Sequence, residues 1–339
     1  MHLTGRSDTG GLFRYVSQLC DALHRQGHHP AVAGQLYETR ELFANKPWPW
    51  VEIPCRGGVV AMVRALQVLQ RWVDDHPVDL LHVHFRKPMF MARRVAARQR
   101  PRLPILYTLH LSGIPIHGMW RWLSDFGDHA HVASVDARDW LIEAAGVQSD
   151  KITIIPHGID PSAFPMTTPT LRAAAREQLQ INTDGPVALY VGRLEDPKNE
   201  NWLLDLAATR KVPGLQIMLA GTGPNEPAVR ERISREGLQD TVKLFPFASP
   251  LPYYQAADAL LLPSQIEGFS LVTIEAMSTG LPVLRTRTAG TTETIVEGVT
   301  GRSTDIEHDA FLHEALSMIS NMTEMKRMGT QAQRMCGHT

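Results

Sequence analysis

Short β-rich runs alternate with segments of helical periodicity along this chain, and the alternation occurs in two series. A proline-rich stretch at 155–170 separates the two series. Alternating strands and helices predict a mostly parallel sheet with helices on both faces. Because 339 residues suit two domains of about 150 residues each, we expect two doubly wound, Rossmann-like α/β domains facing a central cleft, at 1–168 and 169–339.

The first series begins with a short opening strand at 1–4. Further strands are predicted at 31–33, 78–85, 105–110 and 131–135, and helices at 12–23, 59–72, 89–98 and 137–145. The second series has predicted strands at 187–191, 215–220, 242–245, 259–262 and 283–286, and helices at 201–209, 227–236, 252–256 and 271–279. A last helical segment covers 323–334.

Composition excludes several classes of protein. The 34 Lys and Arg residues against 35 Asp and Glu residues give a net charge of −1, which argues against a general nucleic-acid binder. Cys20, Cys55 and Cys336 lie far apart, so neither a disulfide framework nor a cysteine zinc site is indicated. No apolar run approaches the ~18 residues that span a bilayer, and the N-terminus lacks a signal peptide's apolar region. We therefore expect a soluble protein of the reducing cytoplasm.

Two glycine-rich loops do not match the common phosphate-binding motifs. The loop at 5–11 lacks the Gly-Lys-Ser/Thr ending of a P-loop. The loop that begins at Gly221 places Glu226 where a dinucleotide fingerprint needs a glycine for close helix packing. A nicotinamide-dependent oxidoreductase is therefore not supported.

Two histidine pairs have the spacing of possible metal ligands. His82 and His84, like His129 and His131, are two residues apart, so both side chains of a pair lie on one face of a strand. We interpret these histidines as groups that bond to local backbone, in preference to metal ligands.

Basic and amphipathic helices raise the question of a membrane. We expect the helix at 59–72 to pack against the core in preference to touching anionic lipid at the inner membrane face. A run of five basic residues is typical of a solvated helix face, and the alternative is a patch that binds anionic lipid or the acceptor. These residues are Arg93, Arg94, Arg98, Arg100 and Arg102.

The first chemically informative segment follows the strand predicted at 187–191. Arg193 comes directly after Gly192, and Lys198 precedes the next helix. A pair of cations just past a strand end and near a helix start suits a diphosphate. Taken alone, both could equally be members of surface ion pairs.

The second informative segment surrounds the start of the helix predicted at 271–279. Glu267 precedes a glycine turn, and Ser270 is a plausible N-cap. The backbone N–H groups at this helix start can receive phosphate or sugar oxygens. Glu275, about one turn further in, can accept hydrogen bonds from two vicinal hydroxyls. This arrangement suits a sugar nucleotide, with one carboxylate for the sugar and one for the ribose.

Together these segments resemble the retaining, GT-B-fold nucleotide-sugar glycosyltransferases of family 4. The resemblance covers nearly the whole chain, and its motifs occur in family order: Gly10-Gly11, His110, PHGIDPSAF, GRL…KN, LAGTGP, the E-x7-E pair and GLPVLRTRTAGTTETIVEGVTG. Some positions depart from the family. Leu111 stands where many relatives carry an acidic residue, Ala289 replaces one of two glycines, and a proline-rich run at 245–250 replaces a glycine-containing loop. Both ends are also shorter than is common in the family.

The resemblance implies roles for individual residues. Arg193 and Lys198 would hold the donor diphosphate beside Gly192, Glu267 would contact the donor hexose, and Glu275 would contact the ribose. His110 would contact the sugar or the acceptor. The remaining donor-binding positions implied by the resemblance are Gly10 and Gly11 in the first loop, Phe247 in the base-binding segment, and Gly268, Phe269, Ser270 and Leu271 at the helix start.

The function implied is that of a retaining glycosyltransferase that needs neither metal nor cofactor. It would move a hexose from a nucleoside diphosphate sugar, bound by the C-terminal domain, to a hydroxyl acceptor bound by the N-terminal domain. The acceptor would be a glycan, a glycolipid or a small molecule. Two alternatives remain: another GT-B enzyme, such as a phosphorylase or a sugar-nucleotide epimerase, and a non-catalytic sugar-nucleotide-binding protein.

Overall fold

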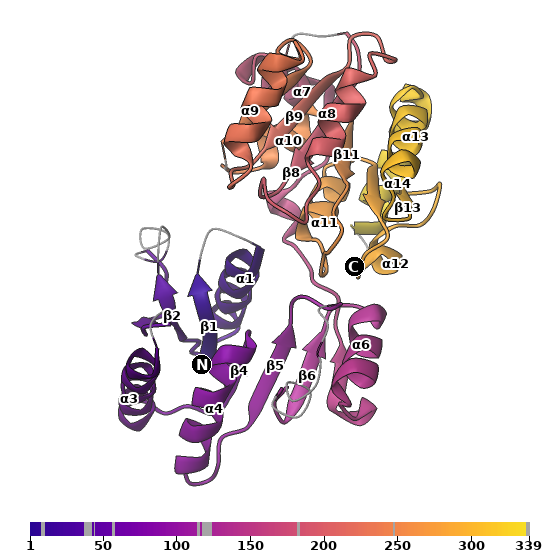
Figure 1. Cartoon of the computed structure of the whole chain (residues 1–339). Coiled ribbons are helices and arrows are strands. Elements are labelled where there is room, and N and C mark those ends of the chain that lie inside the picture. The colour runs from indigo at the N-terminus through magenta and orange to yellow at the C-terminus, as the bar shows by residue number, and fades with distance from the viewer. Residues whose placement is uncertain are drawn as a thin grey trace. The chain divides into compact units, whose positions relative to one another are not determined.

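The computed structural model describes the chain except for residues 8–10, 37–42, 44, 56–57, 114–115, 117–123, 182–183, 247 and 337–339. It contains two compact units, Met1–Ile155 and Pro156–Thr339. Each unit contains one parallel β-sheet with its connecting helices (Figure 1). The two predicted α/β domains are therefore confirmed.

The first unit has a seven-stranded sheet in the order β3-β2-β1-β4-β5-β6-β7, and every neighbouring pair is parallel. Its strands are β1 (His2–Ser7), β2 (Val32–Leu36), β3 (Trp50–Glu52), β4 (Leu81–Val83), β5 (Ile105–Leu109), β6 (His129–Val132) and β7 (Ile152–Ile154). Its helices are α1 (Gly11–Arg25), α3 (Val59–Asp75), α4 (Arg86–Arg98) and α6 (Val135–Ala145), with a 3₁₀ turn at Ser149–Lys151.

The second unit has a six-stranded sheet in the order β10-β9-β8-β11-β12-β13, again parallel throughout. Its strands are β8 (Val187–Val191), β9 (Gln216–Ala220), β10 (Val242–Phe245), β11 (Ala259–Leu262), β12 (Val283–Thr286) and β13 (Gly301–Thr304). Its helices are α7 (Pro169–Gln178), α8 (Asn201–Ala208), α9 (Glu226–Arg235), α10 (Leu251–Ala256), α11 (Leu271–Ser278), α12 (Thr291–Thr294), α13 (His308–Ile319) and α14 (Met322–Cys336), preceded by a 3₁₀ turn at Pro161–Ala163.

Each sheet contains one point where the strand order reverses. In the first unit the chain moves outward from β1 to β3 and then crosses to β4 on the other side of β1. In the second unit it moves from β8 to β10 and then crosses to β11. Because parallel crossovers are right-handed, the helices made before and after the reversal cover opposite faces. Both units are thus doubly wound, and loops diverge at the β1/β4 and β8/β11 positions.

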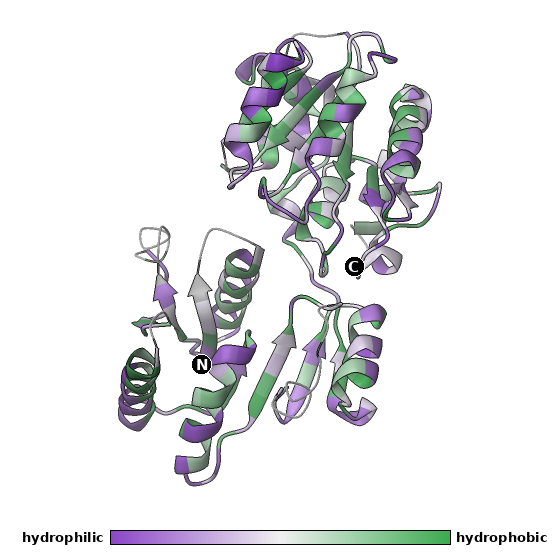
Figure 2. Cartoon of the chain, in the orientation of Figure 1, coloured by the Kyte–Doolittle hydropathy of each residue, from purple (hydrophilic) through white to green (hydrophobic). Residues whose placement is uncertain are grey.

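The strands supply the core of each unit because both of their faces are covered. All five residues of β8 and all four of β11 are buried, as expected for strands in parallel sheets. Figure 2 shows hydrophobic residues along the strands of the second unit and a mixture of residues along those of the first, while the helices carry hydrophilic residues on part of their surface. Strands β3, β7 and β13, with three, three and four residues, were not predicted, because such short runs have little periodicity.

The proline-rich stretch before α7 packs onto the second unit. Ser278 Oγ donates a hydrogen bond to Phe164 O at 2.7 Å, and Thr167 N donates to Thr279 O at 3.0 Å. The Phe164 ring is buried near that of Tyr254. The boundary between the compact units therefore lies after Ile155, whereas the sequence suggested Thr168.

Helix α3 packs as the sequence predicted at its centre, where Ala65, Leu69 and Val73 are buried. Its first turn differs, because Val59 and Val60 are 71% and 67% exposed.

The basic run is only partly a solvated face. Arg93 donates to Asp125 at 2.5 Å and to Asp128 at 2.6 Å, and Arg102 also pairs with Asp128 at 2.8 Å. Asp128 Oδ2 in turn accepts from Ile105 N at the start of β5. These arginines therefore hold the chain ahead of β5 and β6 in place. No helix in the described part of the chain combines the length and the apolar character needed to cross a bilayer.

Candidate functional site

The loops that follow β8 and β11 meet at the reversal point of the second sheet. Lys198 Nζ, from the first loop, donates to Glu267 Oε1 of the second at 2.8 Å. Ser264 Oγ donates to the same oxygen, also at 2.8 Å. The side chains of Lys198 and Glu267 keep 24% and 17% of their surface exposed. Two residues that are far apart in the sequence thus form one partly accessible charged cluster.

Hydrogen bonds from and to the backbone hold these two loops together beside the charged cluster. Asn199, with a φ of 55°, donates from Nδ2 to Pro263 O at 2.9 Å. Gln265 N donates to Pro197 O at 2.8 Å. The Lys198–Glu267 pair is therefore positioned by its flanking backbone as well as by its own attraction.

The side chain of Arg193 is 47% exposed. Its guanidinium pairs with Glu195 at 2.7 Å, while its carbonyl accepts a hydrogen bond from the Tyr190 hydroxyl at 2.7 Å. Burial, together with the charges of Glu200, Glu267 and Glu195, raises the pKa of Tyr190 well above its usual value. The phenol therefore stays protonated and keeps its donor role. Tyr190 fixes the backbone of Arg193 while the cationic group stays accessible to ligand.

Two glycines of the LAGTGP motif let the loop after β9 approach the loop after β8. A Cβ on Gly221, which has a φ of 157°, would lie 1.8 Å from Gly192 O, and one on Gly223 would lie 2.2 Å from Leu194 O. The close approach permits Leu194 N to donate to Thr222 O at 3.0 Å and Asn225 N to donate to Leu194 O at 2.9 Å. This motif therefore positions the backbone around Arg193.

The start of α11 offers polar groups beside Glu267. Ser270 is the N-cap residue, but its side chain makes no capping hydrogen bond. Its hydroxyl is buried and has no hydrogen-bond partner among the residues that the structure describes. The first N–H groups of a helix also lack partners within the helix. Gly268, Phe269, Ser270 and Leu271 thus lie where the sequence placed them, with a helix start suited to ligand oxygens.

Glu275 lies in α11 as predicted but is fully buried. Its Oε2 accepts a hydrogen bond from the Tyr254 hydroxyl at 2.7 Å. The structure therefore brings Glu267 together with Lys198, and brings Glu275 together with a tyrosine of α10. The two glutamates of the E-x7-E pair have different surroundings.

Other family motifs support the Glu267 loop by packing. The rings of His157 and Phe269 meet edge to face, with 5.4 Å between their centroids. A Cβ on Gly290, which has a φ of 77°, would lie 3.2 Å from the Phe269 Cα. The buried Arg285 donates to Thr288 Oγ1 at 2.6 Å and thereby ties down the loop that contains Gly290.

In the first unit, His110 directly follows β5. Its Nε2 is 3.0 Å from His84 Nδ1, and its ring meets that of Tyr15 nearly edge to face. Gly11 is the first residue of α1. Gly10 and Phe247 lie outside the described residues.

The histidine pairs bond to neighbouring protein groups. His131 Nε2 is 2.8 Å from Ile155 O, and His131 Nδ1 is 3.1 Å from Thr108 Oγ1. His82 Nε2 lies 2.6 Å from the same hydroxyl, and His129 Nε2 lies 2.8 Å from Thr153 Oγ1. Burial lowers the pKa of His82 to about 3 and lowers that of His131, so both rings are neutral at pH 7.

The sequence reasoning did not single out Ser264, Asn199 or Tyr190, which position the charged cluster. Asn199 stands within the GRL…KN motif and Ser264 lies three residues before Glu267, so their polar side chains were visible in the sequence. Tyr190 looked like an ordinary apolar member of a strand. His2, which is the partner of His82 across β1 and β4, was missed for a different reason, since its signal in the sequence is the separate strand that carries His82 and His84.

Comparison with known protein families shows which family this chain belongs to. Residues 9–163 match the family described as Glycosyltransferase Family 4, and residues 172–335 match Glycosyl transferases group 1. The two matches follow each other along the chain and correspond to its two units. The protein belongs to the family 4, group 1 glycosyltransferases.

Similar curated proteins include several D-inositol 3-phosphate glycosyltransferases. That of Nocardia farcinica is 28% identical over 285 residues, which cover 75% of this chain and 61% of the relative. That of Frankia alni is 29% identical over 348 residues, which cover 89% of this chain and 83% of the relative. The chain thus spans about three fifths of the Nocardia protein's length.

Among solved structures, HepE of Anabaena in complex with UDP-glucose has a TM-score of 0.83 and 20% sequence identity. The alignment covers 100% of this chain and 95% of HepE. The lipopolysaccharide glycosyltransferase WaaG has a TM-score of 0.81 at 16% identity, with 100% of this chain and 95% of WaaG covered. The GT-B fold predicted from the sequence is thereby confirmed.

Replacing Gly223 by alanine tests the role given to the LAGTGP motif. The added Cβ meets backbone atoms of Leu194 and not a flexible side chain, so we expect Gly223→Ala to lower the free energy of unfolding by about 1–3 kcal/mol, as overpacking does. Urea unfolding measures this loss. Gly158→Ala is the matched control, because its Cβ would meet nothing within 4 Å. Equal stability of the two variants would contradict the proposed loop contact.

Proposed function

We propose that this chain is a retaining glycosyltransferase that moves a hexose from a nucleoside diphosphate sugar to a hydroxyl acceptor without a metal ion. The observation that carries the proposal is the Lys198–Glu267 pair at the reversal point of the second sheet. Ligands of doubly wound sheets bind outside the carboxyl ends of the strands at such a point. Family membership makes a sugar nucleotide the natural occupant.

The diphosphate would bind between cationic side chains and the start of α11. Lys198 reaches the cluster from the β8 loop, and Arg193 presents an exposed guanidinium from the same loop. The buried Ser270 hydroxyl and the first N–H groups of α11 would supply neutral donors. Such groups stabilise a leaving diphosphate most strongly as its negative charge develops.

Glu267 would hold the hexose. In the structure its Oε1 accepts from both Lys198 and Ser264. An incoming diphosphate would draw Lys198 to itself, and the carboxylate would then accept from sugar hydroxyls. This exchange couples recognition of the diphosphate to recognition of the hexose.

Retention follows if the acceptor attacks from the face that the diphosphate leaves. The bond between the anomeric carbon and the phosphate oxygen breaks, and a bond from that carbon to the acceptor oxygen forms on the same face. The acceptor proton passes to the departing phosphate oxygen, so no separate general base is required. The protein then acts by positioning the reactants and by stabilising charge. His110 would contact the sugar or the acceptor.

The relatives suggest which ligands to try first. HepE was solved with UDP and with UDP-glucose, so UDP-sugars are the first donors to test by thermal shift. A ligand at 100 times its dissociation constant stabilises its protein by about 2.7 kcal/mol. Donor hydrolysis measured with and without acceptor then separates a transferase from a protein that only binds sugar nucleotides. Sugar transfer that depends on the acceptor is the expected result.

Arg193 and Lys198, which together form the proposed cationic clamp on the diphosphate, generate a paired prediction. Arg193→Ala and Lys198→Ala should each reduce turnover by about 100- to 1,000-fold, which is the effect of removing one oxyanion donor. Exhaustive dialysis against EDTA should leave turnover unchanged, because protein cations and not a metal would neutralise the diphosphate. Turnover that vanishes with EDTA and returns with a divalent ion would overturn the metal-independent mechanism. Wild-type turnover in the double variant would overturn the clamp.

The two glutamates generate a prediction about division of labour. Glu275→Gln should weaken binding of the free nucleoside diphosphate by roughly 10- to 150-fold, the effect of losing a hydrogen bond of ~1.5–3 kcal/mol to a charged group. Because Gln can still accept from Tyr254, the isosteric variant should preserve the fold. Glu267→Gln should leave this affinity nearly intact and depress turnover, since its partner would be the hexose.

Calorimetric titration of both variants with the nucleoside diphosphate alone measures its affinity for each variant. Their turnover numbers then show which variant loses binding and which loses catalysis. A melting temperature close to that of the wild type serves as the control for each variant. Comparable loss of diphosphate affinity in Glu267→Gln and Glu275→Gln would sink the assignment of different roles.

We also propose a peripheral contact between α3 and anionic membrane. Val59, Val60 and Val63 are exposed on this helix, and Arg64 and Arg71 are exposed along it. Apolar residues interspersed with basic ones suit an interfacial helix.

Sedimentation with vesicles tests this membrane contact. We expect the wild type to sediment with phosphatidylglycerol vesicles at low salt, and the Val59→Asp/Val60→Asp variant to stay in the supernatant. Val299→Asp, at an exposed apolar position of the second unit, is the control and should sediment like the wild type. A wild type that stays in the supernatant at low salt contradicts the proposal.

A further inference from the structure

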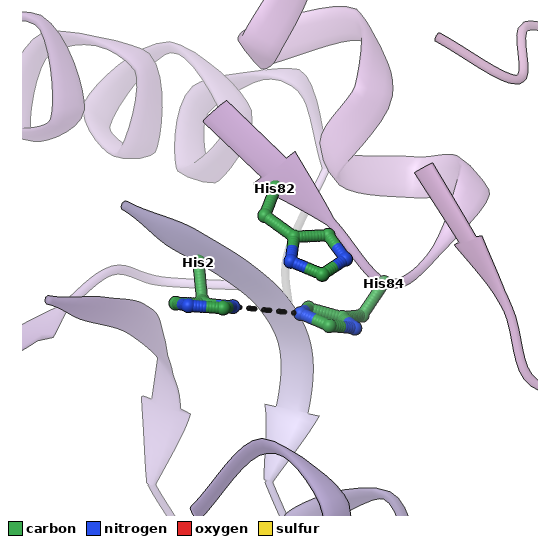
Figure 3. Close-up of side chains that lie close together, drawn as sticks. All are labelled: His2, His82 and His84. Carbon is green, nitrogen blue, oxygen red and sulfur yellow. Dashed lines mark hydrogen bonds between the residues drawn. The ribbon is translucent and has the colours of Figure 1, made fainter. Parts of the chain in front are cut away.

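Four neighbouring strands of the first unit bring together five histidines. His2, His82 and His131 lie in β1, β4 and β6, while His84 directly follows β4 and His110 directly follows β5. His2 and His82 are partners across the β1–β4 pair. His2, His82 and His84 are all buried, and their rings lie close together (Figure 3). This arrangement arises because parallel strands place side chains of matching register on one face.

His84 occupies the middle of a hydrogen-bonded chain. Its Nε2 lies 3.2 Å from His2 Nδ1, the contact drawn as a dashed line in Figure 3. Its Nδ1 lies 3.0 Å from His110 Nε2. Both ring nitrogens of His84 are thus engaged, one toward the buried start of β1 and one toward His110.

The protonation state of this chain restricts where its protons can lie. Burial, followed by the neighbouring histidines, lowers the pKa of His84 and of His2 well below the usual value. Both rings are therefore neutral at pH 7 and carry one N–H each. A neutral His84 can donate on one side only and must accept on the other.

Two proton arrangements satisfy both contacts. In one, His84 donates from Nδ1 to His110 Nε2, so a neutral His110 has its proton on Nδ1. In the other, His110 donates from Nε2 to His84, and His84 donates from Nε2 to His2. In each arrangement the tautomer of His110 is determined by that of His84.

The neighbouring histidines form a separate branch with a fixed direction. Because Ile155 O can only accept, His131 must donate to it from Nε2 and accept at Nδ1 from Thr108. The Thr108 hydroxyl then accepts from His82 Nε2. His82 thus lies on the same strand as His84 and is similarly buried, but its hydrogen bond leads to Thr108 and not to His110.

We propose that His84 is a positioning residue that sets the tautomer and ring orientation of His110. The inference rests on the proposed function, in which His110 contacts the reacting sugar or the acceptor. The tautomer decides whether His110 Nδ1 donates or accepts a hydrogen bond, so it decides which group of a substrate that nitrogen can bind.

A pair of isosteric variants tests the proposal. The side-chain amide of His84→Asn takes the place of Nδ1, so it keeps the bond to His110 and loses the bond to His2. The amide of His84→Gln takes the place of Nε2, so it keeps the bond to His2 and loses the bond to His110. His82→Asn is the control, because it loses the bond to Thr108 in an equally buried position.

The readouts are the histidine ring ¹⁵N shifts of labelled protein, which report each tautomer, together with kcat and KM. His110→Gln assigns the His110 signals. We expect His84→Asn and His82→Asn to keep the His110 tautomer and wild-type kcat. We expect His84→Gln to change that tautomer and to reduce kcat by about tenfold, the effect of one hydrogen bond, with KM little changed.

Each alternative result has a defined meaning. Equal effects of His84→Asn and His84→Gln on His110 and on kcat would overturn the positioning role. A changed His110 tautomer with unchanged kcat would support the hydrogen-bonded chain and contradict the role of His110 in transfer. If the variants do not fold, the wild-type ¹⁵N spectrum still tests the proposal, because a charged His84 would exclude the hydrogen-bonded chain of histidines. One equivalent of zinc in the purified wild type would also overturn the positioning role of His84, since the metal would occupy the lone pairs of His2 and His84.

Discussion

The reversal of strand order within each parallel sheet determines where this protein can bind a ligand. Strands that all run one way present their carboxyl ends at the same edge, and right-handed crossovers place successive helices on one face until the order reverses. At β8/β11 and β1/β4 the loops diverge to opposite sides. The Lys198–Glu267 pair lies at the first of these points, and His84 lies at the second, directly after β4.

Backbone packing provides the precision that a reversal point alone lacks. Gly221 and Gly223 allow the loop after β9 to approach the carbonyls of Gly192 and Leu194 closely. The Tyr190 hydroxyl donates a hydrogen bond to the carbonyl of Arg193. The contacts are short and act on the main chain, so they leave the guanidinium exposed. A flexible side chain on a fixed backbone can follow a diphosphate as its charge changes.

The two units treat buried polar groups in different ways. In the second unit a buried phenol donates a hydrogen bond to a buried carboxylate, from Tyr254 to Oε2 of Glu275, within the core. In the first unit imidazoles bond to one another from His2 through His84 to His110. Imidazole suits such a chain because its neutral form carries a donor and an acceptor on opposite sides of one ring. Buried polar groups of this kind are retained at low energetic cost only when all are bonded.

The sequence by itself determined most of the strands and helices, the two α/β domains and the resemblance to a glycosyltransferase family, because periodicity and motifs are local properties. It also placed Glu267 before a glycine turn and Ser270 at a helix start. Only the tertiary structure decided that Lys198 pairs with Glu267, that Glu275 is buried against Tyr254, and that His2 joins His84 and His110. These contacts join residues between 21 and 82 positions apart, and strand register and loop packing, which bring them within hydrogen-bond distance, arise only when the sheets assemble.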